Sequence, residues 1–106
     1  MSVHVIAVWT APKARADEVR DLLRELAAVT LTEEGCLQFE VWEADDLPGR
    51  FVLMEEYLGE SARLAHLATD YFSSLVLDRA VGLRVERDVR VHRQVEPAAQ
   101  SSRRRR

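Results

Sequence analysis

The sequence predicts an α+β domain in which a strand, a helix, two strands, a helical segment and a last strand follow one another. Three observations support this prediction: short runs rich in Val and Ile, one long segment with apolar residues at helical spacing, and two strand-like runs joined by a turn. The order βαββαβ is that of ferredoxin-like folds, in which the strands form one antiparallel sheet and the helices cover one of its faces.

The first strand and the first helix make up the N-terminal third of the chain. Residues 3–11, VHVIAVWTA, predict a strand that places Trp9 on one face together with Val3, Val5 and Ala7. Residues 16–32 predict an amphipathic helix, because apolar residues recur at helical spacing at Val19, Leu22, Leu23 and Leu26. We expect Gly35 to close this helix in the left-handed backbone conformation that glycine readily adopts.

The next two strands are predicted to form an antiparallel hairpin. Residues 36–43, CLQFEVWE, place on one face Leu37, Phe39 and Val41. Residues 44–50, ADDLPGR, contain the Asp, Pro and Gly that favour a turn. Residues 51–57, FVLMEEY, then return as the partner strand.

Two short helices and a strand complete the predicted domain. The first helix includes Leu64 and Leu67, and the second is capped by Thr69 or Asp70 and contains Phe72, Leu75 and Val76. Residues 81–95 alternate apolar and polar side chains, which predicts a long last strand with one apolar face made of Val81, Leu83, Val85, Val89, Val91 and Val95.

Composition and charge limit the class of protein. The 106 residues, 47% hydrophobic and 31% charged, fit one globular domain, which we place at residues 1–96, followed by a flexible basic tail at 97–106. The net charge is −3, and the four arginines 103–106 leave −7 on residues 1–102, which argues against nucleic-acid binding by the folded body. Without a basic leader or a run long enough to span a membrane, the chain is expected to be soluble and cytoplasmic. The single cysteine, Cys36, is expected to be a small core residue.

The sheet face that the helices leave uncovered is also expected to carry Trp, Met and Val side chains. Burying two such faces against each other removes their apolar surface from water. We therefore predict a homodimer.

Four segments together resemble the antibiotic biosynthesis monooxygenase family of dimeric α/β barrels. In order they are VIAVWTA, LLRELAAVTLTEEGCLQFEVWE, PGRFVLMEEY and AHLATDYF, within residues 3–77. Within this family the chain looks most like the bacterial quinol monooxygenases, and this resemblance implies oxidation of a hydroquinone-type substrate by dioxygen without flavin or metal. The chain is also similar to the isomerases that process phospho-autoinducer-2.

Departures from particular branches narrow this resemblance. The family members that oxygenate anthrones carry Asn, Trp and Tyr where this chain has Leu53, Tyr57 and Arg63. The haem-degrading members carry a Trp at the position of His66, and a His shortly after the position of Phe72 that this chain lacks. Neither anthrone oxygenation by that machinery nor haem cleavage is therefore expected.

His66 and Glu55 are the candidate catalytic residues. The ordinary pKa of a histidine lies near working pH, so His66 suits the base that makes a substrate electron-rich; it could equally be a surface histidine bonded to Glu55 or water. Glu55 shares a strand face with apolar residues, where a carboxylate needs a partner, and it could orient His66 or pair with an arginine. Candidate substrate contacts are Tyr57, Leu67, Phe72, Tyr71, Leu53 and Trp9.

Other kinds of site lack their sequence patterns. The three histidines, 4, 66 and 92, do not have the spacing of a zinc site, and the glycines form no phosphate-binding loop. We therefore expect no metal and no bound nucleotide. The resemblance implies further that no cofactor is used and that the partners are a small aromatic or hydroquinone-type substrate and dioxygen. The alternatives are a non-catalytic dimer that binds a small molecule and an isomerase of the phospho-autoinducer-2 type.

Overall fold

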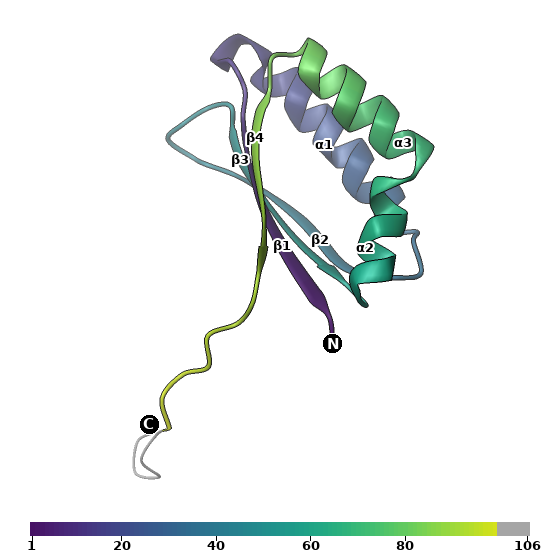
Figure 1. Ribbon diagram of the computed structural model, residues 1–106. Coiled ribbons are helices and arrows are strands. Elements are labelled where there is room, and N and C mark those ends of the chain that lie inside the picture. The colour runs from purple at the N-terminus through teal and green to yellow at the C-terminus, as the bar shows by residue number, and fades with distance from the viewer. Residues whose placement is uncertain (100–106) are drawn as a thin grey trace.

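The computed structural model describes residues 1–99 and contains the predicted order of elements (Figure 1). The strands are β1 (Val3–Thr10), β2 (Cys36–Glu43), β3 (Arg50–Tyr57) and β4 (Glu86–His92). The helical elements are η1 (Lys13–Arg15), α1 (Ala16–Thr30), α2 (Glu60–Leu67), α3 (Asp70–Phe72) and η2 (Ser73–Ala80). The fold is the α+β ferredoxin-like fold that the sequence predicts.

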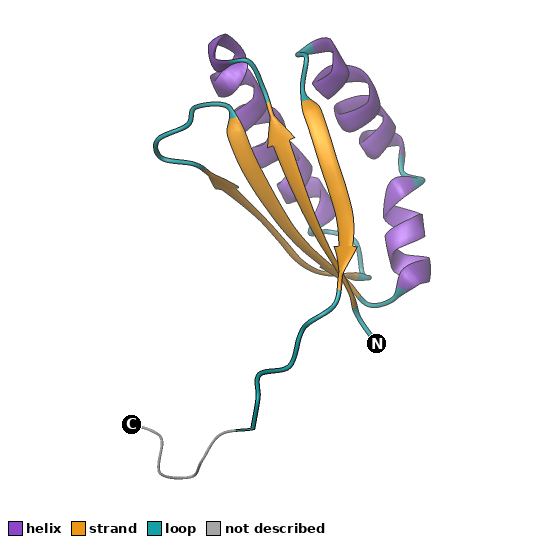
Figure 2. Cartoon of the chain, turned by 60° about the vertical axis from the view of Figure 1, so that its left-hand side comes forward, coloured by secondary structure: helices purple, strands orange, loops and turns teal. Residues whose placement is uncertain are grey.

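The four strands form one sheet in the order β2-β3-β1-β4, with every neighbouring pair antiparallel. The helices pack on one face of this sheet, and the other face is free of helices (Figures 1 and 2). Because side chains alternate between the two faces of a strand, the register decides which residues point toward the helices. On β1 these are Val3, Val5, Ala7 and Trp9.

The core lies between the sheet and the helices. Helix α1 contributes its predicted apolar stripe, in which Val19, Leu22 and Leu23 are fully buried. Asp17 and Glu18 lie in its first turn, where the helix dipole favours negative charge. At the N-terminus of α3, the Thr69 hydroxyl accepts a hydrogen bond from the amide of Phe72 at 3.2 Å, so Thr69 caps this helix, as predicted.

The last strand is shorter than the sequence pattern indicates. Helical backbone continues from Ser73 through the π-helix η2 to Gly82, so residues 81–85 do not belong to β4 and that part of the prediction is wrong. Arg84, with φ 65°, ends the helical segment: its amide bonds Val81 O and the amide of Val85 bonds Ala80 O. This is the Schellman arrangement of a helix C-terminus. Leu83 and Val85 pack against the core from this helix end, which accounts for their apolar character.

Two further predictions about local structure are corrected. Gly35 does not adopt a positive φ; instead, a Cβ at this position would lie 2.5 Å from the Cβ of Ala62, so its role is to let α2 approach closely. Leu37 does not share a face with Phe39 and Val41, because a bulge between Cys36 and Gln38 shifts the register. Leu37 is half exposed, and Cys36 instead takes the helix-facing position, partly buried against the core.

Beyond β4 the described chain extends away from the sheet without regular structure (Figure 2). Most of the tail predicted at residues 97–106 lies outside the described residues. Within residues 1–99, every helix is too short or too polar to cross a membrane.

Candidate functional site

A pocket lies over the centre of the sheet, beneath the helices. The sheet leaves space here because the central strand β1 carries the small side chains of Val5 and Ala7. The large side chains of Trp9 on β1 and Tyr57 on β3 lie at the two ends of this space. The cavity has a volume of about 50 Å³, which is room for dioxygen or a few water molecules. A larger ligand requires the side chains at its mouth to move.

His66 is the buried side chain of α2 and lies in the pocket wall. It is only 3% exposed, although it stands among the polar and small residues of a short surface helix. Aromatic rings surround it: the ring centroids of Tyr57 and Phe72 lie 5.3 Å and 5.2 Å away, and those of Phe39 and Tyr71 at just over 6 Å. An imidazole in such surroundings is held in one orientation.

Glu33 fixes that orientation. Its Oε2 lies 2.8 Å from Nδ1 of His66, and the hydroxyl of Tyr71 donates a hydrogen bond to the same carboxylate oxygen. A carboxylate can only accept, so Nδ1 of His66 carries the proton, and Nε2 is left as the basic nitrogen. No hydrogen bond from residues 1–99 engages Nε2. Burial and the bond to Glu33 raise the pKa of Tyr71 to about 12, so this phenol stays a donor.

Glu55 and Tyr57 form a second carboxyl–phenol pair in the same pocket. The Tyr57 hydroxyl donates to Oε1 of Glu55 at 2.6 Å, and Tyr57 is fully buried. Burial raises the pKa of the Glu55 carboxyl, although the bond from Tyr57 opposes this rise. Burial likewise raises the pKa of the Tyr57 phenol far above its ordinary value. The pocket therefore contains a carboxyl group that is easier to protonate than one in water.

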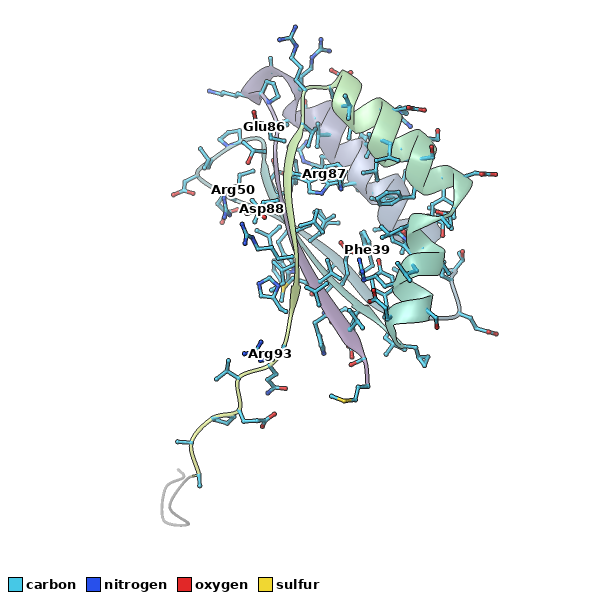
Figure 3. The ribbon with its side chains drawn as sticks, viewed as in Figure 1. Phe39, Arg50, Glu86, Arg87, Asp88 and Arg93 are labelled. Carbon is cyan, nitrogen blue, oxygen red and sulfur yellow. The ribbon has the colours of Figure 1, made fainter. Side chains whose placement is uncertain are left out.

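Arg87 lies at the mouth of the pocket. It is opposite Trp9 in the β1–β4 register, and its guanidinium carbon stands 5.8 Å from the Trp9 ring centroid and 6.0 Å from that of Phe72. Figure 3 shows Arg87 on the helix side of the sheet with Phe39, whereas Glu86 and Asp88 lie on the opposite side. Partial burial lowers the pKa of Arg87 from its ordinary value.

The structure brings most of the sequence-predicted site residues together. Seven of them line the pocket: His66, Glu55, Tyr57, Leu67, Phe72, Leu53 and Trp9. Tyr71 is not part of the lining and instead contacts the pocket through Glu33. Within residues 1–99, Glu55 hydrogen-bonds neither His66 nor an arginine, the two partners considered for it from the sequence; its bonded partner is Tyr57.

Two residues of the site were missed from the sequence. Glu33 lies in the turn after α1 and reaches His66 only through the close packing at Gly35, which no local pattern indicates. Arg87 could have been noticed in the sequence. It stands between Val85 and Val89 in the series of alternate residues that is otherwise apolar. A lone arginine at such a position indicates a charged group that faces the core side of a sheet.

The family model of the antibiotic biosynthesis monooxygenases matches residues 2–76 of this chain. The chain belongs to this family. All the pocket residues from β1, β3 and α2 lie within the matched range, whereas Arg87 on β4 lies outside it. No curated protein matches the sequence.

Solved structures support the membership in the antibiotic biosynthesis monooxygenase family. One described as an antibiotic biosynthesis monooxygenase is 31% identical, with a TM-score of 0.80 over 89% of this chain and 99% of that one. Rv0793 from Mycobacterium tuberculosis is 24% identical, with a TM-score of 0.79 over 93% and 100% of the two chains. A conserved protein from Methanosarcina mazei is 23% identical, with a TM-score of 0.80 over 90% and 94%. The similarity to the last two structures, at less than 25% identity, supports only the fold.

In this family member the arrangement provides an oriented imidazole and the phenol of Tyr57 at an apolar cavity. Nε2 of His66 can accept a proton from a hydroxyl group in the cavity, and the Glu33 carboxylate stabilises the imidazolium that results. Aromatic and aliphatic walls suit a planar ring. Among residues 1–99, no three His, Cys, Asp or Glu side chains gather as metal ligands do.

Proposed function

We propose that the protein is a cofactor-independent monooxygenase that oxidises a small hydroquinone-type substrate with dioxygen. The observation that carries this proposal is the buried Glu33–His66 pair: the imidazole lines a pocket with aromatic walls, and no hydrogen bond within residues 1–99 engages its Nε2. A buried imidazole with a fixed tautomer is the arrangement expected of a general base.

The chemistry begins with the transfer of a hydroxyl proton from the substrate to Nε2 of His66. The resulting anion is rich in electrons and passes them to dioxygen held in the cavity. One oxygen atom then bonds to the ring, and the other leaves as water with two hydrogens from the substrate. A hydroquinone and dioxygen thus give a hydroxyquinone and water, and no external reductant is consumed.

Glu55 and Tyr57 are proposed to contact the substrate on the side of the cavity near the strand end of β3. Because burial raises the pKa of Glu55, its carboxyl can hold or return a proton near neutral pH more readily than a surface glutamate. Leu53, Leu67, Phe72 and Trp9 are proposed to contact the ring, and Tyr71 to restrain Glu33.

Oxygen consumption with a panel of hydroquinones tests the proposal. We expect uptake by the metal-stripped protein, with His66→Ala reducing it at least 100-fold, which is the usual size of a general-base contribution. His4→Ala is the matched control, because it removes a histidine that does not line the pocket, and it should retain full activity. Uptake that survives in His66→Ala would remove this residue from the mechanism.

Two other functions would give different results in the same assay. An isomerase or a non-catalytic binder would consume no oxygen with any compound of the panel. Binding of a small ring without oxygen uptake would favour the binder.

We also infer that the protein is a homodimer joined through its helix-free sheet face. That face carries the apolar side chains Ile6, Val8, Trp42, Val52 and Met54, and Trp42 is 60% exposed in the single chain. A second copy of the same face is a partner of matching apolar character.

A further inference from the structure

Arg87 is the one cation among the pocket's lining residues that has no carboxylate partner within the described chain. The other lining arginine, Arg63, is held by Glu60 through two hydrogen bonds, at 2.9 Å and 2.6 Å. By contrast, no carboxylate oxygen of residues 1–99 lies within 4.0 Å of the Arg87 guanidinium. Its neighbours Glu86 and Asp88 point to the other side of the sheet (Figure 3).

The position of this guanidinium is set by aromatic faces rather than by charge. Its guanidinium carbon lies about 6 Å from the ring centroids of Trp9 on β1 and Phe72 on α3, both of which line the pocket. A cation–π contact is an attraction between the charge and the ring face and does not depend on N–H donors. Within residues 1–99 the guanidinium of Arg87 donates no side-chain hydrogen bond, so its donors are available to a ligand.

Glu55, the acidic residue of the pocket lining, does not occupy these donors. Glu55 attracts Arg87 electrostatically without a hydrogen bond, and its Oε1 accepts a hydrogen bond from the Tyr57 hydroxyl. Because burial raises the pKa of Glu55, this carboxyl opposes an anion in the pocket less than an ordinary glutamate would. The pocket is thus lined by the oriented imidazole of His66, by the phenol of Tyr57 and by the Arg87 guanidinium, which has no carboxylate partner within residues 1–99.

We infer that the ligand of this pocket is an aromatic ring that carries a carboxylate, with the ring on the apolar walls and the carboxylate on Arg87. The planar fork of a guanidinium matches the two oxygens of a carboxylate, and such a charge-assisted pair contributes both affinity and orientation. This inference deepens the proposed function, since it names the substituent that places a hydroquinone ring with its hydroxyl toward His66.

Calorimetric titration of the full chain under argon tests this inference without turnover. The probes are 2,5-dihydroxybenzoate, a hydroquinone with a carboxylate, and its methyl ester, which has the same ring without the charge. We expect the acid to bind wild type about tenfold or more tightly than the ester, because hydrogen bonds between two charged groups are stronger than those between neutral groups. Arg87→Gln should bring the two affinities together.

Arg93→Gln is the matched control, because it removes the same charge from the exposed chain just beyond β4 (Figure 3). It should keep the preference for the acid. Equal binding of acid and ester by wild type, or loss of the preference in both variants, would overturn the inference, as would failure of both probes to bind. Binding of the acid through Arg87 without oxygen uptake in air would retain the inference and reject the proposed oxygenase.

Discussion

At the scale of the residue, the pocket concentrates groups that are costly to bury, and Glu55 is the most informative of them. A carboxyl whose pKa is higher in the folded than in the unfolded state binds more protons when folded. The contribution of Glu55 to the free energy of unfolding therefore has its full value at low pH, where this carboxyl is protonated in both states. It declines as the pH rises from 4.5, the ordinary pKa of a glutamate, through the higher pKa of Glu55 in the folded protein. The native carboxyl thus reduces stability at neutral pH.

Glu55→Gln is therefore expected to raise the melting temperature at about pH 8, because the amide oxygen still accepts from Tyr57 and no charge is buried. The difference from wild type should shrink as pH falls and vanish near pH 4, which thermal unfolding across this range measures. Glu34→Gln, in the exposed turn after α1, is the control and should show no such convergence. A melting temperature of Glu55→Gln that stays equal to wild type at every pH would contradict this assignment.

Only those site residues that follow a local periodic pattern could be predicted from the sequence. Alternation along the first strand grouped Trp9 with Val5 and Ala7, and alternation along the third grouped Glu55 with Leu53 and Tyr57. The β1–β3 register shows that both groups face the helices. Glu33 was not predicted as a site residue. It lies in a turn, 33 residues before His66 in the sequence, and no periodic pattern indicates a contact between residues so far apart.

At the scale of the element, the close approach of α2 to the turn after α1 positions the Glu33–His66 pair. Gly35→Ala is expected to lower the free energy of unfolding by about 1–3 kcal/mol, since its Cβ would stand 2.5 Å from that of Ala62 and both are tied to backbone. Chemical denaturation measures this loss. Gly82→Ala, which meets nothing within 4 Å, is the control and should be neutral or stabilise by up to about 1 kcal/mol. Equal stabilities of the two variants would show that the approach is not tight.

Element types were easier to predict from the sequence than element ends. The alternation Val81, Leu83, Val85 continued that of β4, but these residues belong to a helix end in which Leu83 and Val85 turn toward the core. Likewise, the bulge at Cys36 moved Leu37 out of the predicted face. In both places tertiary packing overrides a local period that is compatible with more than one structure.

At the scale of the whole molecule, the two faces of the sheet differ in how they are covered. Helices bury one face, and the other leaves Trp42, Val52 and Val8 side by side across three strands. Val52→Asp places a charge in the middle of this row. We expect the wild type to have the mass of a dimer by light scattering and Val52→Asp that of a monomer, because the charge would be buried without a partner.

Leu77→Asp is the control for this experiment, because Leu77 is 49% exposed on the helical layer, and it should remain dimeric. A wild type that is monomeric at micromolar concentration, or a Val52→Asp variant that stays dimeric, would reject the helix-free face as the interface.

The π-helix η2 has a consequence for comparing this chain with its relatives. Each amide in a π-helix bonds the carbonyl five residues earlier rather than four, so the segment holds more residues per turn than an α-helix of equal length. A relative that is α-helical here would span the same distance with fewer residues. Alignments should therefore be anchored separately at Phe72 and at Val85, with the insertion or deletion placed inside residues 73–80, or every β4 position, Arg87 included, will be paired with the wrong neighbour.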